Sequence, residues 1–397
     1  MQICEPGSCI GCGLCVMACP VRCIGLVENQ EGFDAPVVDD SACIQCGRCR
    51  AVCPAANEVD RPAVRRPLAA FGAWAGDPAI RDSSSSGGVF TVLAAHVLHL
   101  KGCVAGAVYA ADFQGVEHVV VDGPEQLDRL RKSKYVQSRL AGLWAQLDRA
   151  VHSAQPFLFS GTPCQVLAFK RRYGDVESVA TVEVICHGVL SPALFRAYIA
   201  WLRNRLGNLD GYEMRSKCMG WRAAATRYRG DGRRECCLAP ARDPFRSLYS
   251  RALGMRPCCH TCRYTGFPRI ADVTLGDFWG VERLFPGRND NRGVSAVLAN
   301  TAKGLALVQS CLPSLEWWHA DTDQIVAGNP NLVMATPAPP LREAFFETFR
   351  SRDFGRLRRY FSPKRRGLLH VARAAARRLR EGAGSWLLDD LWVPEKR

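Results

Sequence analysis

A cysteine motif that occurs twice constrains this chain more than any other feature. Residues 8–19 read SCIGCGLCVMAC and residues 42–53 read ACIQCGRCRAVC, and a proline follows each copy. Both copies fit the pattern C-x2-C-x2-C-x3-C-P, with an offset of 34 residues between them. Thiolates are soft ligands, and this spacing is that of cysteines bound to [4Fe–4S] clusters. The pattern therefore predicts two such clusters near the N-terminus.

The spacing also predicts which cysteines share a cluster. The fourth cysteine of such a motif ligates the cluster of the other loop. One cluster is then held by Cys9, Cys12, Cys15 and Cys53, and the other by Cys43, Cys46, Cys49 and Cys19. Zinc is the alternative metal, but it rarely needs two identical runs of four cysteines. Residues 1–60 resemble the two-cluster bacterial ferredoxins.

The cysteine count and the lack of export signals indicate the compartment. The chain has 20 cysteines in 397 residues, no apolar run of membrane-spanning length, and no basic-then-apolar segment over Met1 to Ser8. Cysteines in such a chain bind metals or act in catalysis more often than they form disulfides. We expect a cytoplasmic protein without a membrane span.

Beyond a charged linker over Glu58–Pro67, apolar periodicity predicts an α+β protein in which the ferredoxin domain precedes a mixed α/β domain. Strands are expected over residues 103–110, 116–121, 156–160, 176–185 and 270–279, and helices over 87–100, 124–131, 140–153, 165–172 and 192–206. We divide the rest of the chain into an α/β part (70–206), a less regular part with a CxxC pair (207–340), and a basic helical tail (341–397).

The tail carries most of the net charge. The chain has a net charge of +14, and residues 350–380 contribute +11 of it. Residues 367–392 look amphipathic, which is typical of contact with an anionic membrane surface, with a protein partner, or with the chain's own body. No nucleic-acid-binding motif accompanies the charge, so we expect no nucleic-acid partner.

Four further cysteines stand in distinctive contexts. Cys164 lies in FSGTPCQ, Cys186 in VICHG, and Cys259 and Cys262 in RPCCHTC. The first two follow apolar strands, and α/β proteins place their sites at such strand ends. Cys164 would also begin a helix, where the pKa of a thiol is lowered. Small buried hydrophobes or a zinc site remain alternatives.

The order of SSSSGGVF, SKYVQS, FSGTPCQV, VICHGVLSP, CCHTCRY and ADVTLGDFWG resembles the coenzyme F(420) (deazaflavin) hydrogenase/dehydrogenase beta-subunit family. It is similar above all to bacterial members with a fused N-terminal ferredoxin. The resemblance implies an α/β domain that binds FAD beside a third [4Fe–4S] cluster. It implies Cys164, Cys186, Cys259 and Cys262 as ligands, with Cys258 as a rival for Cys259. The other cysteines are expected to be structural: Cys4, Cys23, Cys103, Cys218, Cys236, Cys237, Cys258 and Cys311.

The sequence contains no GxGxxG fingerprint, so the phosphates of a flavin cofactor would need another anion-binding site. A run of small residues before the apolar helix is one candidate, because free N–H groups and the helix dipole favour a phosphate there. It comprises Ser84, Ser85, Ser86, Gly87 and Gly88. An ordinary helix N-cap is the alternative. Lys134 and Tyr135 form a second candidate, as a phosphate contact and a ring that stacks on the cofactor.

The resemblance implies an iron–sulfur flavoprotein oxidoreductase. Electrons would pass from the ferredoxin clusters to FAD, and from there to an organic substrate or the deazaflavin coenzyme. The expected partner is an electron-donor protein or a reduced coenzyme. The alternative is a non-catalytic electron-transfer subunit of a hydrogenase or dehydrogenase complex. The sequence identifies no catalytic residue.

Overall fold

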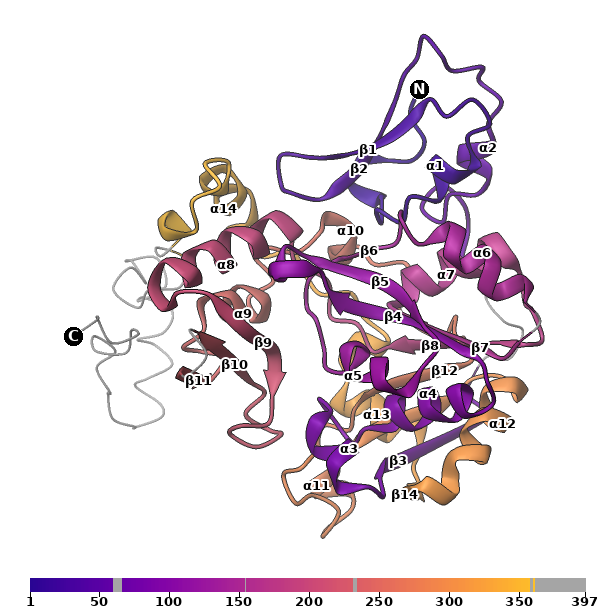
Figure 1. Cartoon of the computed structure of the whole chain (residues 1–397), viewed down its shortest axis with the longest axis vertical. Coiled ribbons are helices and arrows are strands. Elements are labelled where there is room, and N and C mark those ends of the chain that lie inside the picture. The colour runs from indigo at the N-terminus through magenta and orange to yellow at the C-terminus, as the bar shows by residue number, and fades with distance from the viewer. Residues whose placement is uncertain (60–65, 154, 231–233, 358–359, 361–397) are drawn as a thin grey trace.

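The computed structural model describes residues 1–59, 66–153, 155–230, 234–357 and 360. A small N-terminal module lies on top of a large α/β body, and a second, smaller sheet extends from its side (Figure 1). Among the described helices, none combines the length and apolar character that a membrane crossing requires.

The N-terminal module consists of two short helices and one hairpin. Its elements are η1 (Pro6–Ser8), α1 (Leu14–Ala18), β1 (Ile24–Glu28), β2 (Asp34–Val38) and α2 (Arg48–Ala51). Strands β1 and β2 pair antiparallel. Gly13 and Gly47 precede the two helices with φ of 74° and 73°, in the left-handed region that glycine adopts at little cost. Each cysteine loop can therefore turn sharply into its helix.

The body is built on a nine-stranded sheet with the order β14-β3-β13-β12-β8-β7-β4-β5-β6. Strands β12, β8, β7 and β4 are parallel neighbours, and antiparallel pairs flank them on both sides. The strands are β3 (Ala69–Ala75), β4 (Cys103–Tyr109), β5 (Val116–Val121), β6 (Ser138–Arg139), β7 (Phe157–Gly161), β8 (Val179–Val184), β12 (Val273–Asp277), β13 (Ser295–Ala299) and β14 (Leu315–His319).

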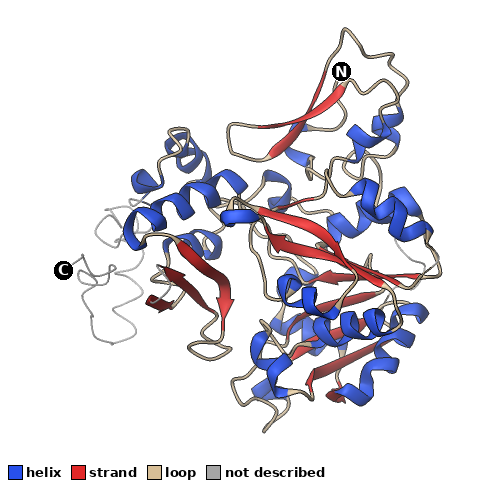
Figure 2. Cartoon of the chain, in the orientation of Figure 1, coloured by secondary structure: helices blue, strands red, loops and turns tan. Residues whose placement is uncertain are grey.

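Helices cover both faces of this sheet (Figure 2). Helices α4, α5 and α12 pack on one face, and α6 and α7 pack on the other. The bounds of the helices in the body are α3 (Pro78–Ser83), α4 (Val89–His99), η2 (Ala111–Phe113), η3 (Pro124–Gln126), α5 (Leu127–Leu130), α6 (Trp144–His152), α7 (Pro163–Tyr173), α10 (Pro257–His260), α11 (Val281–Leu284), α12 (Ala302–Cys311), η4 (Leu312–Ser314), α13 (Thr322–Gly328) and η5 (Pro330–Leu332). Because both faces are covered, the central strands are largely buried on both sides.

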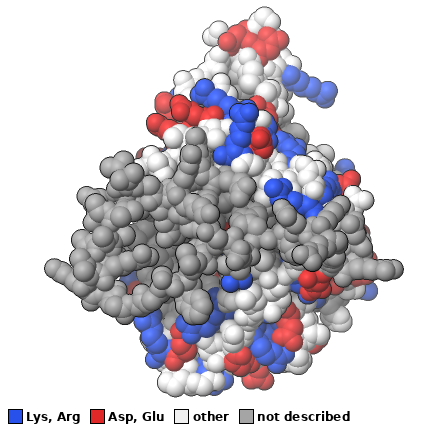
Figure 3. All heavy atoms as spheres, turned by 90° about the vertical axis from the view of Figure 1, so that its left-hand side faces the viewer, with Lys and Arg blue, Asp and Glu red and all other residues white. Residues whose placement is uncertain are grey.

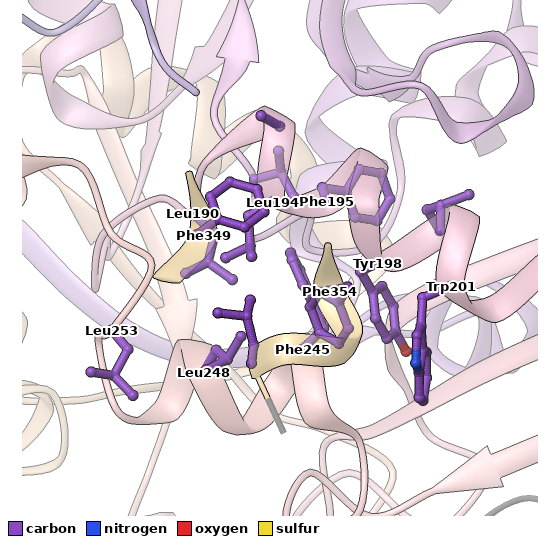
Figure 4. Close-up of a cluster of buried hydrophobic side chains, with 14 of the residues drawn as sticks. Leu190, Leu194, Phe195, Tyr198, Trp201, Phe245, Leu248, Leu253, Phe349 and Phe354 are labelled. Atoms are coloured by element: carbon purple, nitrogen blue, oxygen red, sulfur yellow. The ribbon is translucent and has the colours of Figure 1, made fainter. Parts of the chain in front are cut away.

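The remaining elements form a third unit around an aromatic core of its own. Its elements are α8 (Pro192–Leu206), β9 (Leu209–Ser216), β10 (Ala225–Gly230), β11 (Arg234–Leu238), α9 (Pro244–Ser250), α14 (Arg342–Phe349) and η6 (Phe354–Leu357). Figure 4 shows side chains of α8, α9, α14 and η6 converging, with Phe195, Phe245 and Phe349 fully buried. The start of the predicted tail therefore belongs to the core.

The structure confirms the mixed α/β fold behind a ferredoxin-type domain. The five strands predicted beyond the linker are β4, β5, β7, β8 and β12, and the five predicted helices also form. The sheet takes strands from both 70–206 and 207–340, so the two ranges build one layer. Residues 358–359 and 361–397 lie outside the described part of the chain, and so does the predicted amphipathic segment. On the face shown in Figure 3, acidic and basic side chains are interspersed over the described atoms.

Candidate metal and cofactor site

The eight motif cysteines surround two separate cavities in the N-terminal module. Cys9, Cys12, Cys15 and Cys53 line one cavity of about 330 Å³, which we call cavity A. Cys19, Cys43, Cys46 and Cys49 line the other, of about 310 Å³, which we call cavity B. These are the two sets that the spacing predicts, because the antiparallel repeat brings each fourth cysteine to the opposite loop. Their role as ligands stays a prediction.

Cavities A and B each gather four motif thiols from two loops. Four thiolates are the usual ligand set of a [4Fe–4S] cluster, and two identical runs of four exceed what a zinc site needs. The residues of both cavities therefore fit a [4Fe–4S] cluster.

The second set of cysteines meets in a third cavity, of about 680 Å³, which we call cavity C. Cys164 enters from the second residue of α7, directly after β7, and Cys186 follows β8. Parallel strands bring their carboxyl ends to the same edge of a sheet, which is why these two residues meet. Cys258, Cys259 and Cys262 close the cavity from α10 and the turn after it.

The adjacent cysteines of α10, Cys258 and Cys259, pack against different cores. Cys258 packs in the same apolar cluster as Cys164 and Cys262. Cys259 packs against the other core, beside Gly188, whose ideal Cβ would lie 3.3 Å from the Cys259 Cβ. Both residues still line cavity C. The packing favours Cys258 as the partner of Cys164 and Cys262, whereas the sequence pattern favoured Cys259.

Burial controls the acidity of the thiols in cavity C. Burial raises the pKa of Cys164 to about 12, and the neighbouring Cys258 and Cys262 thiols add to the effect. Burial likewise raises the pKa of Cys186 and of Cys262. This direction is opposite to the lowered pKa that a helix N-terminus predicts for Cys164. Ionised thiols here would need compensating positive charge, which iron ions supply.

Cavity C adjoins cavity A. The side chain of Ile10 lines both cavities. The Trp144 indole N–H on α6 donates to the Cys12 carbonyl oxygen (3.0 Å). The buried Arg256 guanidinium donates to the carbonyl oxygens of Cys9 (2.6 Å) and Asp34 (2.8 Å). The ferredoxin module is thus held with cavity A against the α/β body.

The two segments proposed for flavin binding lie side by side, although 48 residues separate them in the sequence. The Ser133 N–H donates to the Ser85 hydroxyl (2.8 Å). The Arg131 guanidinium donates to the Ser83 hydroxyl (2.8 Å). The serine run and the segment Lys132–Tyr135 are therefore in direct contact.

Much of the serine run is engaged within the protein. The hydroxyls of Ser84 and Ser86 donate to the carbonyl oxygens of Ile80 and Val294 (both 2.7 Å), and the Gly87 N–H donates to Ser295 (3.0 Å). Gly88 is the N-cap of α4 at φ 88°, which itself favours glycine. Packing therefore accounts for both the cap and the glycines without a ligand. The serines as direct flavin contacts stay a prediction.

Three basic side chains lie beside the serine run and Tyr135: Lys134 and Lys217 are half-buried, and Arg246 is buried. Burial lowers the pKa of Lys134 to about 7, and the Lys132 charge adds to this. Burial also lowers the pKa of Lys217 to about 7, while its amine donates to the Ser86 carbonyl oxygen (2.6 Å). The guanidinium of Arg246 lies 4.3 Å from the Tyr135 ring centroid, and its Nε and Nη1 have no hydrogen-bond partner. Such groups fit an anionic ligand.

Aromatic side chains connect this cationic region to cavity C. Tyr135 stacks on Tyr249 with ring centroids 4.2 Å apart. Tyr249 in turn lies 5.2 Å from the ring of His187, which lines cavity C. His187 itself is hydrogen-bonded to Asn331 (3.0 Å), as a structural histidine would be.

The two aspartates of the ADVTLGDFWG segment have structural partners. Asp272 is buried and accepts from the Thr181 N–H (2.8 Å) and hydroxyl (2.6 Å). Asp277 pairs with Arg215 and accepts from the Trp221 indole N–H (2.7 Å). Trp221 stacks on Trp279, with centroids 4.9 Å apart.

Sequence reasoning missed several residues of this region. Lys217, Arg246 and Arg256 stand outside any motif, and only the fold brings them to the sites. It also missed the disulfide between Cys218 and Cys237, whose Cα atoms lie 6.3 Å apart. Cys218 follows β9 and Cys237 lies in β11, and no spacing rule connects them.

Comparison with known proteins places the chain in a family. Residues 70–144 match the N-terminal and residues 155–323 the C-terminal profile of the coenzyme F(420) hydrogenase/dehydrogenase beta subunit. Residues 8–57 match the 4Fe–4S dicluster domain. No curated protein matches the chain.

One solved structure is similar over most of the chain. It is a xenon-derivatised F(420)-reducing nickel–iron hydrogenase complex from Methanosarcina barkeri. The identity is 16%, the alignment covers 75% of this chain and 91% of the other, and the TM-score is 0.47. From the family profiles we conclude that the chain belongs to the coenzyme F(420) hydrogenase/dehydrogenase beta-subunit family and is an iron–sulfur electron-transfer protein with an N-terminal dicluster domain.

Proposed function

We propose that this protein is an oxidoreductase that accepts single electrons at its ferredoxin module and delivers electron pairs to an organic acceptor at its α/β domain. Iron–sulfur clusters carry one electron at a time, and a flavin converts single electrons to the pairs that most organic acceptors need. The deazaflavin coenzyme and other conjugated organic molecules are candidate acceptors. The family membership and the succession of three thiol-lined cavities support this proposal.

The main support for this proposal is the order in which cavities B, A and C follow one another. Cavity B holds the exposed Cys46 and lies in the part of the module where solvent and a donor protein can reach it. Cavity A shares Ile10 with cavity C. Cavity C leads through His187 and Tyr249 to the cationic region at Tyr135. The residues thus form a continuous route from the surface of the module into the α/β domain.

The residues of the cationic region fit FAD. An anionic cofactor group would accept hydrogen bonds from the unpartnered nitrogens of Arg246, and the charges of Lys134 and Lys217 would favour it. Tyr135 presents a ring for stacking, beside Tyr249. The serine run would contribute to FAD binding those polar groups that are not already hydrogen-bonded within the protein.

The decisive experiment is anaerobic purification of the full chain, followed by iron, sulfide and flavin counts. We expect FAD in the wild type, and less FAD with unchanged iron in Arg246→Met. Arg129→Met is the matched control, because Arg129 is an exposed arginine on α5. A wild-type protein that holds all its iron and binds no added FAD would contradict the flavin proposal.

Three further variants test a third cluster in cavity C and its ligand set. Cys262→Ser should lower the iron content by about one cluster, because each [4Fe–4S] cluster needs its cysteine ligands. Cys258→Ser and Cys259→Ser are compared next, and the one that loses iron is the ligand. An iron content that all three variants share with the wild type would exclude the third cluster.

The alternative function is that of an electron-transfer subunit that performs no chemistry alone. The observation that favours it is the family itself, whose profiles describe beta subunits. A hydrogenase or dehydrogenase subunit would then be the partner. Reduction of an added acceptor by the isolated chain favours the oxidoreductase. Reduction only in the presence of a co-purified partner favours the subunit.

A further inference from the structure

Cavity B is lined by five cysteines, although a cubane needs four. The fifth is Cys23, which is buried beside the motif cysteines. Its sulfur lies 3.4 Å from the Cys19 sulfur, and its backbone N–H donates to that same sulfur (3.3 Å). Cys43 packs in the same buried cluster as Cys23.

Cavity A has a fifth cysteine as well. Cys4 lines it together with its four motif cysteines. Cys4 packs in the same buried cluster as Cys53. In each cavity, the extra cysteine therefore lies beside the fourth cysteine of one motif.

The internal repeat indicates that the ferredoxin fold does not require these thiols. The 34-residue offset places Val38 at the position equivalent to Cys4, and Asn57 at the position equivalent to Cys23. Val38 lines cavity B as an apolar side chain. Asn57 instead donates to three carbonyl oxygens, including that of Cys53 (2.9 Å). At the equivalent positions of the repeat, other residue types therefore satisfy the packing of the ferredoxin fold.

We propose that Cys23 and Cys4 are reserve ligands, each able to bind a cluster iron in place of the adjacent fourth motif cysteine, Cys19 or Cys53. In the exchange, one iron–sulfur bond to Cys19 breaks and one to Cys23 forms. The proton of the Cys23 thiol goes to the departing Cys19 sulfur or to solvent, and no electron is transferred. The proposal depends on the dicluster domain and not on a flavin or an acceptor.

The geometry gives the physical reason. A cluster that loses one protein ligand leaves one iron accessible to solvent. A thiol already 3.4 Å from the departing sulfur can reach that iron by side-chain rotation, without rearrangement of the loop. Thiolate is the ligand type that iron in such clusters selects.

The test uses the full chain, purified anaerobically, with single and double alanine variants. We expect Cys19→Ala to keep the wild-type iron and sulfide content and the electron paramagnetic resonance of a reduced [4Fe–4S] cluster, with a shifted midpoint potential. Cys23→Ala should also keep its iron. Cys19→Ala/Cys23→Ala should lose iron and show the oxidised [3Fe–4S] signal. Cys46→Ala is the matched control, since Cys46 lines the same cavity without a contact between its sulfur and Cys23 in the described structure.

Loss of iron from Cys19→Ala equal to that from Cys46→Ala would overturn the proposal. Cys53→Ala, alone and with Cys4→Ala, repeats the test at cavity A. Failure of both Cys19→Ala and Cys53→Ala to accumulate as folded protein would also count against it, because a replaced ligand would preserve the cluster and the fold.

Discussion

At the residue scale, one buried ion pair supports cavity C. The Arg269 Nε lies 2.5 Å from the Glu183 carboxylate, and both side chains are almost fully buried. Arg269 also donates to the carbonyl oxygens of Gly266 and Leu332 (both 3.2 Å). It therefore connects β8 to the segment that follows the CxxC pair.

Removal of one partner from this pair should be costly. Arg269→Met leaves the Glu183 charge buried without its partner, which costs about 3–5 kcal/mol. We expect a clearly lower melting temperature, with partial recovery in Glu183→Leu/Arg269→Met. The control is Arg139→Ala, which removes an exposed pair with Asp34 worth about 0–1 kcal/mol. Equal melting temperatures for Arg269→Met and Arg139→Ala would contradict the assignment.

His118 should make stability depend on acid pH. Burial lowers the pKa of His118 to about 4, against a partial offset from its hydrogen bond to the Ser160 carbonyl oxygen (2.9 Å). As the pH falls below about 6.5, the unfolded chain binds a proton that the folded chain excludes until about pH 4. Stability therefore falls across this window, by up to about 3 kcal/mol for this group.

The measurement compares melting temperatures of wild type and His118→Gln at about pH 7 and about pH 5. We expect the wild type to lose more stability than the variant between these conditions, because glutamine does not titrate. Cluster loss in acid affects both proteins alike, so the difference between them is the readout. Parallel losses would show that His118 does not contribute.

At the element scale, the start of α7 positions Cys164. The Gln165 side chain accepts from the Thr162 backbone N–H (3.0 Å) and donates to the Ser138 hydroxyl (2.9 Å). The helix start is thereby connected to β6. Because Gln165 is buried, water cannot replace either contact.

Gln165→Leu should destabilise the protein by about 2 kcal/mol, because it leaves buried polar groups without partners. The matched control is Gln324→Leu at α13, where the same capping arrangement lies at the exposed Asp321 N–H (3.0 Å). We expect the melting temperature to fall by several degrees in the first variant and to change little in the second. A larger effect at α13 would refute the argument from burial.

At the scale of the whole molecule, Arg256 holds the ferredoxin module against the α/β body. Its guanidinium donates to the Cys9 and Asp34 carbonyl oxygens and to the Gln137 side chain (2.7 Å). The contact brings cavity A beside cavity C. Arg256 is therefore the buried cation among several contacts that fix the module on the body.

Arg256→Leu should loosen the module from the body. Each hydrogen bond from a charged group is worth about 1.5–3 kcal/mol, so we expect amide exchange in β1 and β2 to rise by roughly tenfold or more. Hydrogen–deuterium exchange measures this directly. Arg139→Leu serves as the control, because its exposed contact is with the Asp34 carboxylate at the same interface. Unchanged exchange in Arg256→Leu would exclude this role.

The sequence by itself determined the local elements and the cluster-binding module. Apolar runs such as Val179–Val184 predict buried strands. Cysteine spacing predicts which residues of a single loop can bind one cluster. It did not predict β9, β10 and β11, nor that β13 and β14 join the main sheet. Strands β13 and β14 pair with the distant β3. The sequences of β9, β10 and β11 mix charged with apolar residues, which leaves only a weak local pattern.

The tertiary structure decided what surrounds the sites. Arg246, Lys217 and Arg256 come from loops and helices without a motif, and their environment exists only after the chain has folded. The same holds for Cys4 and Cys23, which have no ligand spacing and still lie at the two ferredoxin cavities. The physical reason is that spacing constrains residues within one turn, whereas burial, charge and contact depend on segments that the fold brings together from distant positions.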